Sequence, residues 1–165
     1  MGRKKIIKTT IEDIKEVEKQ EGQLEIQLKE NKRITGYINE LKENDIFVFG
    51  SNTAGKHGKG AAKLARQRWG AIYGQAEGLQ GKTYGIPTVN STITNKLPLK
   101  EIQIYIDRFI QFAKDNPNLN FLVTEIGCGL ASYISKDIAP LFKEAINVEN
   151  IYLPESFWKI LLNNN

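Results

Sequence analysis

The sequence predicts an α/β fold of three layers, in which helices flank a central, mixed and mostly parallel sheet. Three observations predict it. Short apolar runs at 46–49 and 121–124 are typical of strands buried on both faces. Segments with apolar residues at helical spacing alternate with these runs. Each run also leads directly into a glycine-rich loop, an arrangement that places ligands at the carboxyl ends of strands.

The chain divides in sequence into an N-terminal extension and a main domain. We expect residues 1–40 to form a helix and strand extension or an edge of the sheet, and residues 41–165 to form the main domain. Helical spacing of apolar residues predicts a helix over 10–20, with Thr10 as its cap and Gly22 as its end.

The segment after this helix fits two structures. Residues 23–28 alternate apolar and polar side chains, which favours a half-buried strand with 33–38 as its candidate partner strand. A longer helix that continues through Leu24 and Leu28 is the alternative. We prefer the strand because Gly22 interrupts the helical pattern and the alternation is regular.

The main domain alternates predicted strands and helices, as a largely parallel sheet requires. In chain order these are strand 46–49, helix 59–69, strand 84–88, helix 98–114, strand 121–124, helix 136–145 and strand 150–153. A polar loop over 90–97 separates the second strand from the second helix.

Composition indicates an ordinary globular protein. Of its 165 residues 41% are hydrophobic and 25% charged, which is enough to bury a core without disulfides. Cys128 is the only cysteine, and no cluster of cysteine and histidine suggests zinc. No apolar run approaches the roughly 20 residues of a membrane span, and the N-terminus lacks the apolar core of a signal peptide. We therefore expect a cytoplasmic protein with no membrane, metal or cofactor.

The positive charge is concentrated in one glycine-rich stretch. Residues 51–82 carry six lysines and arginines against Glu77 alone, whereas residues 1–50 are balanced. Such a local field favours an anionic partner, although a solvated basic helix face gives the same pattern.

The first glycine loop follows strand 46–49 and has four glycines within residues 50–60. Glycine lets backbone N–H groups approach a ligand, and the following helix start favours phosphate. The spacing matches neither the dinucleotide fingerprint nor the P-loop. The candidate ligand-binding residues here are Gly50, Ser51, Asn52, Gly55, His57, Gly58, Lys59, Gly60 and Ala61.

The second glycine loop follows strand 121–124. Because both loops lie at strand ends, we expect them side by side over one sheet edge, where two loops could hold a diphosphate. Ordinary strand-to-helix connections, the alternative explanation, run roughly 2–6 residues with less glycine. The candidate ligand-binding residues here are Ile126, Gly127, Cys128, Gly129, Leu130, Ala131 and Tyr133.

Four motifs together resemble macro-domain-related proteins of phages and bacteria over about residues 41–157. They are Gly-Ser-Asn followed by His-Gly-Lys-Gly-Ala-Ala, Tyr73-Gly74 with Gly78-Leu79-Gln80-Gly81, Ile86-Pro87-Thr88, and the run from Thr124 to Ala131. The resemblance implies a macro-domain-like fold that binds ADP-ribose or a related phosphorylated nucleotide, and an ADP-ribosyl hydrolase is one candidate activity. If the chain is phage-encoded, it would act in the host cytoplasm.

The resemblance also assigns roles to particular residues. Asn52 matches the asparagine that contacts the distal ribose, Gly58, Gly60 and Ala61 lie beside the ligand, and the run from Gly127 to Leu130 wraps the diphosphate. The chain departs from the pattern in two ways. Phe49 stands where the family has an earlier asparagine, and no acidic residue clearly matches the one that recognises adenine, although Asp45 lies near that region.

Asn52 and His57 are the catalytic candidates. Asn52 could orient a ribose hydroxyl or a water, and His57 could transfer a proton or donate to phosphate. The alternative for His57 is that it only shapes the turn. Cys128 is a candidate nucleophile or, as we prefer, a small residue tolerated in a tight loop. The absence of paired carboxylates from both loops favours binding or slow hydrolysis.

Three further hypotheses concern the surroundings of the loops. Tyr133, Phe157 and Trp158 are candidates to stack on a base, with core packing as the alternative. The basic segment 56–68 could instead bind nucleic acid, which we rank lower because aromatic residues are not interleaved with its charges. The fold could also serve as a scaffold for a protein partner.

Overall fold

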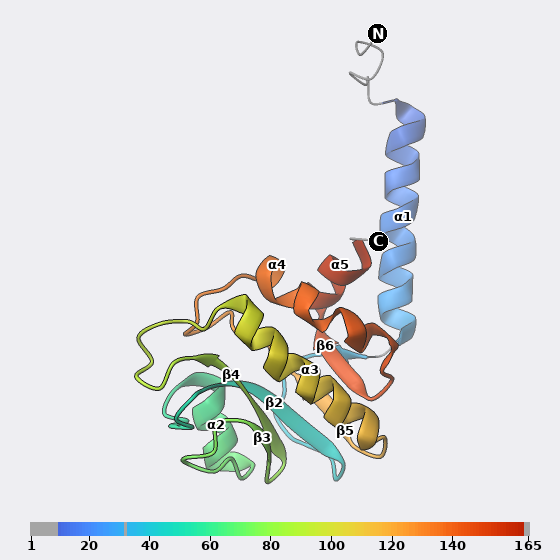
Figure 1. The fold of residues 1–165 in the computed structure, drawn as a ribbon. Coiled ribbons are helices and arrows are strands. Elements are labelled where there is room, and N and C mark those ends of the chain that lie inside the picture. The colour runs from blue at the N-terminus through green and yellow to red at the C-terminus, as the bar shows by residue number, and fades with distance from the viewer. Residues whose placement is uncertain (1–9, 32, 164–165) are drawn as a thin grey trace. The chain divides into compact units, whose positions relative to one another are not determined.

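The computed structural model describes residues 10–31 and 33–163 (Figure 1). The chain divides into two compact units between Lys32 and Arg33. The division falls before the 40/41 boundary expected from the sequence, because residues 34–35 already pair with the main sheet. Within the described residues, no helix combines the length and the apolar character that a membrane crossing needs.

The N-terminal unit is a single helix in the part that the structure describes. Helix α1 spans Ile11–Asn31, so the strand predicted over 23–28 is wrong and the longer helix is correct. Gly22 lies inside the helix, where glycine costs about 1 kcal/mol but does not terminate it. The predicted cap is confirmed: Thr10 Oγ1 accepts from the Asp13 amide at 3.1 Å, and the Asp13 carboxylate accepts from the Thr10 amide at 3.0 Å.

The six strands of residues 33–163 form one mixed sheet in the order β1-β6-β5-β2-β4-β3. In chain order they are β1 (Ile34–Thr35), β2 (Asp45–Asn52), β3 (Gly78–Gln80), β4 (Thr83–Val89), β5 (Asn120–Val123) and β6 (Ile151–Pro154). All neighbouring pairs are parallel except β3 and β4. The predicted α/β class with a mixed, mostly parallel sheet is therefore confirmed.

Two helices cover opposite faces of the sheet, α2 (Gly60–Arg68) behind it and α3 (Leu99–Asp115) in front in Figure 1. Phe49 of β2 belongs to the cluster that packs on Ala65 of α2. On the other face, Phe109 of α3 meets Tyr84 of β4 and Phe121 of β5 with ring centroids 5.1 and 5.5 Å apart. Central strands buried on both faces explain the continuous apolar runs in the sequence.

The C-terminal part differs from its prediction in two places. The helix predicted over 136–145 is a short α4 (Ser135–Ile138) followed by the 3₁₀ helix η2 (Ala139–Asn147). Pro140 explains the change, because it has no amide to donate and its ring clashes with the preceding turn. Helix α5 (Glu155–Asn163) was not predicted, and it buries Phe157 and Trp158 almost completely.

Strand β1 pairs with β6 rather than with residues 23–28. Arg33, just before β1, donates to the carbonyls of Ala145, Ile146 and Ile151 at 2.9–3.0 Å, and its guanidinium lies 5.1 Å from the centroid of the Trp158 ring. One long side chain thus attaches the start of the main unit to its C-terminal elements.

Candidate functional site

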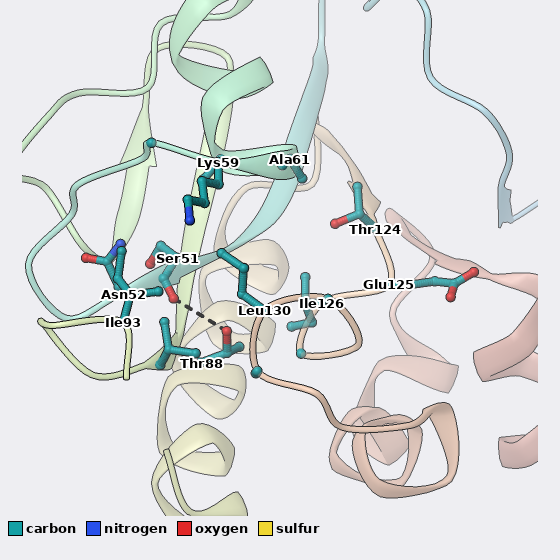
Figure 2. A pocket seen from close by; sticks show the side chains of 18 residues that line it. Ser51, Asn52, Lys59, Ala61, Thr88, Ile93, Thr124, Glu125, Ile126 and Leu130 are labelled. Carbon is teal, nitrogen blue, oxygen red and sulfur yellow. Dashed lines mark hydrogen bonds between the residues drawn. The ribbon is translucent and has the colours of Figure 1, made fainter. Parts of the chain in front are cut away.

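A cavity of about 130 Å³ lies where β2, β4 and β5 end. This volume is well above the roughly 10–15 Å³ that a cavity needs to hold a single water. Residues from both glycine loops and from the segment after β4 line it: Gly50, Ser51, Asn52, Gly58, Lys59, Gly60, Ala61, Ala62, Thr88, Val89, Ile93, Thr124, Glu125, Ile126, Gly127, Gly129, Leu130 and Ala131. The two loops therefore lie together over one sheet edge, as the sequence predicts (Figure 2).

The three strand ends meet at Gly50. A Cβ atom on this residue would lie 3.3 Å from Thr88 Oγ1, 3.6 Å from the Gly127 amide nitrogen and 3.7 Å from Ile126 Cβ. A side chain at position 50 would therefore crowd the Thr88 hydroxyl, whereas its contacts with the second loop would lie at ordinary van der Waals distances.

Asn52 holds the first loop in shape. Its Oδ1 accepts from the amides of Ala54 and Lys56, both at 3.1 Å, in an Asx-type turn. Its Nδ2 has no hydrogen-bond partner among the described residues, and Asn52 lines the cavity. The carboxamide thus uses its acceptor for the fold and keeps two donor hydrogens for a ligand.

Three backbone amides at the start of α2 also lack partners. The first helical bond in this region runs from the Lys63 amide to the Lys59 carbonyl, so the amides of Gly60, Ala61 and Ala62 have none within the described residues. All three residues line the cavity. Lys59 is the N-cap residue without a side-chain cap, and its side chain extends toward Ser51 and Asn52 in Figure 2.

The second loop supplies a matching set. Its internal bonds run from Cys128 to the Glu125 carbonyl and from Ser132 to the Gly129 carbonyl, and they leave the amides of Gly129, Leu130 and Ala131 without partners in the described chain. All three of these residues line the cavity. Residues from two separate loops whose amides have no partner among the described residues therefore line the same small volume.

His57 does not line the cavity. It is fully buried, its Nε2 lies 2.9 Å from the Gln75 carbonyl and 3.1 Å from Gln80 Oε1, and its ring meets Phe49 edge-on. The Gln75 carbonyl and Gln80 Oε1 are both acceptors, and Gln80 Oε1 also accepts the Ile72 amide. The His57 Nε2 atom therefore carries the ring proton. The structure places His57 where it shapes the turn.

Three other predicted ligand-binding residues also lie off the cavity. Gly55 packs against the backbone of Gln75, and Tyr133 donates its hydroxyl to the Leu97 carbonyl at 2.6 Å. Cys128 is half-buried, and loss of solvent around the thiol is the main reason its pKa is raised. The candidates Phe157 and Trp158 are 0% and 1% exposed, so both belong to the core rather than to a stacking surface.

Six lining residues were not predicted: Ala62, Thr88, Val89, Ile93, Thr124 and Glu125. The sequence pattern could have predicted four of these residues, because they end or directly follow buried strands: Thr88, Val89, Thr124 and Glu125. No sequence pattern predicts Ile93. It has a φ of +58°, a conformation that strains a β-branched residue, and it sits in a loop organised by Asn90 Oδ1.

A second, larger cavity of about 720 Å³ adjoins the first and shares Thr124 and Glu125 with it. Its walls come from the segment after β1, from the start of α5 and from apolar side chains: Thr35, Gly36, Tyr37, Ile38, Phe47, Leu64, Val123, Pro154, Glu155, Ser156 and Lys159. The hydroxyls of Thr35 and Ser156 are buried there, and neither has a partner among the described residues.

No protein-family model, curated protein or solved structure matches this chain. Over residues 10–31 and 33–163, no group of three or more histidine, cysteine, aspartate and glutamate side chains is placed to hold a metal ion.

Proposed function

We propose that this protein binds ADP-ribose or a related phosphorylated nucleotide, with the diphosphate between the two glycine loops. One observation carries the proposal: the residues of two loops whose amides lack partners among the described residues line one cavity, namely Gly60, Ala61 and Ala62 from one loop and Gly129, Leu130 and Ala131 from the other. Such donors are costly unless water or a ligand satisfies them. Phosphate oxygens satisfy several at once, and the dipole of α2 favours their charge.

The electrostatics of the cavity agree with an anionic ligand. Lys59 extends into it from the start of α2. Glu125 is the one carboxylate among the lining residues, and in Figure 2 its side chain is directed away from Lys59 and Asn52. An incoming phosphate would therefore meet a cation and amide donors rather than a negative charge.

The adjoining cavity favours a nucleotide over phosphate alone. It opens beside Thr124 and has apolar walls that include Ile38 and Leu64. The apolar face of a nucleobase suits such walls. A ligand with phosphates in the first cavity and a base in the second would occupy both.

The proposal concerns binding. Asn52 presents donor hydrogens that suit a ribose hydroxyl, but it cannot accept a proton as a base. His57 is buried outside the lining, and Glu125 faces away. The groups that the described residues place at this cavity therefore support binding rather than proton transfer.

Calorimetric titration with ADP-ribose, beside AMP, ADP and NAD, tests the proposal. Gly58→Glu and Gly129→Glu are the informative variants, because a Cβ at either position meets nothing within 4 Å and neither glycine has a left-handed φ. Each places a carboxylate at the cavity without distorting the loop. Gly22→Glu is the matched control, since Gly22 is equally open but lies in α1.

We expect saturable ADP-ribose binding that Gly58→Glu and Gly129→Glu weaken at least tenfold, or about 1.4 kcal/mol, while Gly22→Glu binds like the wild type. Asn52→Asp should weaken binding too, because it keeps the acceptor that holds the loop but replaces the free amide donors with a negative charge. The absence of binding to all four ligands, or equal binding by all variants, would contradict the proposal.

A further inference from the structure

We infer that the nucleotide bound in the cavity belongs to a single-stranded nucleic acid, whose phosphates follow a basic stripe along α2. The stripe consists of Lys59, Lys63 and Arg66, and it ends at Tyr73. This inference rests on the proposed function, since it names the class of molecule that presents the nucleotide.

The stripe starts at the cavity itself. Lys59 lines the cavity, and Lys63 and Arg66 follow it at spacings of four and three residues, which places all three on one face of the helix. At 1.5 Å per residue they cover about 10 Å along the helix. A strand with one end in the cavity would therefore run past further cations.

Among the described residues, no carboxylate forms an ion pair with these cations. Lys63 and Arg66 are exposed, and the ion pairs in the described chain are Arg108 with Glu77 and Lys159 with Glu155, so no carboxylate lies within 4 Å of the stripe. The first turn of α2 also contains no acidic residue. An ordinary solvated helix face would carry some compensating acids, whereas this one keeps its full positive charge.

An aromatic ring lies at the far end of the stripe. The Arg66 guanidinium lies 5.2 Å from the centroid of the Tyr73 ring, which is 61% exposed, and Ile72 beside it is 52% exposed. The turn carrying Tyr73 is attached to the first glycine loop by a 2.8 Å bond from the Gly74 amide to the Gly55 carbonyl. Proteins that bind single strands typically combine cations that contact the phosphates with exposed aromatic rings on which bases stack. The sequence pattern shows no aromatic residue among the basic ones, but the fold brings Tyr73 next to Arg66.

Fluorescence anisotropy with a mixed-sequence, single-stranded DNA 12-mer labelled at its 3′ end tests this inference. The test variant is Lys63→Glu with Arg66→Glu, neither of which lines the cavity. The control is Lys100→Glu with Lys143→Glu, an equal change in charge at exposed lysines of α3 and η2. Titration of each variant with ADP-ribose shows separately whether the cavity is intact.

We expect the logarithm of the wild-type association constant for the strand to fall with the logarithm of the salt concentration. The slope should be about −2, from about 0.7 for each of three phosphates. The test variant should bind at least tenfold more weakly at 50 mM salt with a slope shallower by about one unit, and it should keep its ADP-ribose affinity. The control should change strand binding less than threefold. Saturating ADP-ribose should weaken strand binding, because both ligands use the cavity.

Four results would overturn the inference. The wild type could fail to bind the strand, both double variants could lose affinity equally, or ADP-ribose could leave strand binding unchanged. Equally tight binding of polyglutamate would be the fourth, and it would indicate an acidic protein partner. Failure of the ADP-ribose titration alone, with strand binding lost only in the test variant, would instead reject the proposed function and with it the link between stripe and cavity.

Discussion

The two glycine loops use their glycines in two different ways. In the first loop a Cβ on Gly55 would lie 2.6 Å from backbone atoms of Gln75, whereas a Cβ on Gly58 would meet nothing within 4 Å. In the second loop a Cβ on Gly127 would lie 2.7 Å from Ile138 Cδ1, whereas one on Gly129 would meet nothing. Each loop therefore has one glycine that allows tight packing and one that keeps the cavity open.

The packed glycines differ in what they touch. Gly55 meets main chain, in a loop that Asn52 Oδ1 and buried His57 also hold. Gly127 meets the side chain of Ile138 rather than main chain, with Cδ1 at 2.7 Å and Cγ1 at 3.0 Å. The comparison indicates a rigid first loop and a more adaptable second loop, and the predictions below test this difference.

The largest effect is expected for Gly55→Ala. Its φ of +66° disfavours any side chain, and the new Cβ would press on the Gln75 backbone, which cannot move without the turn around it. Left-handed strain of about 1–2 kcal/mol and overpacking of about 1–3 kcal/mol together predict a loss of about 2–5 kcal/mol. Urea unfolding measures it. A loss below about 1 kcal/mol would show that the first loop is not rigid.

Gly127→Ala should cost less, about 1–3 kcal/mol: its φ of +76° adds left-handed strain as at Gly55, but the new Cβ meets a side chain instead of main chain. Ile138→Val removes the Cδ1 atom that the new Cβ would approach and by itself costs about 0.5–1.5 kcal/mol. Unfolding of the double variant should therefore show a smaller loss than the two single losses added, by at least about 0.5 kcal/mol. Additive losses would place the strain of Gly127→Ala in the backbone instead of at Ile138.

Sequence reasoning found the cavity because its signal is local. A buried strand followed at once by glycine predicts where each loop starts, and parallel strands bring such loops to the same edge. The main strands, α2 and most lining residues of both loops follow from these patterns. Residue 93 could not be found this way, since nothing in a polar loop marks the one side chain that turns toward the cavity.

Longer-range features could not be predicted from pattern alone. The position of His57 depends on Gln75 and Gln80, which lie 18 and 23 residues further along the chain. The segment 23–28 satisfies both helical and strand periodicity, so a single interior glycine was an insufficient reason to end α1. The partner of β1 was wrong for the same reason, because it depended on that strand.

His57→Phe should have a smaller effect than either glycine change. Phenylalanine preserves the aromatic contact with Phe49 but loses the donor to the Gln75 carbonyl and to Gln80 Oε1. Gln80 Nε2 and the Ile72 amide still satisfy these acceptors, so we expect a loss of about 1–2 kcal/mol in urea unfolding. ADP-ribose affinity should stay within about twofold. Loss of binding at unchanged stability would instead show that His57 contacts the ligand.

The smallest effect concerns the thiol of the second loop. Burial is the main cause that raises the pKa of Cys128, Glu125 and Asp137 raise it further, and a hydrogen bond with Ser135 opposes them. The folded protein should therefore form the reactive thiolate at higher pH than the unfolded chain, and the stability that this thiol contributes should fall as pH rises above the unfolded pKa.

Alkylation of Cys128 with iodoacetamide measures this shift, because the chain has no other cysteine. The rate should reach half its maximum at higher pH in the native protein than in urea, where the thiol has its ordinary pKa. A native midpoint below the unfolded one would mean that the amides of the second loop stabilise the thiolate more than burial opposes it. In that case the second loop would stabilise the Cys128 thiolate itself, and the loop would suit a nucleophile rather than a bound phosphate.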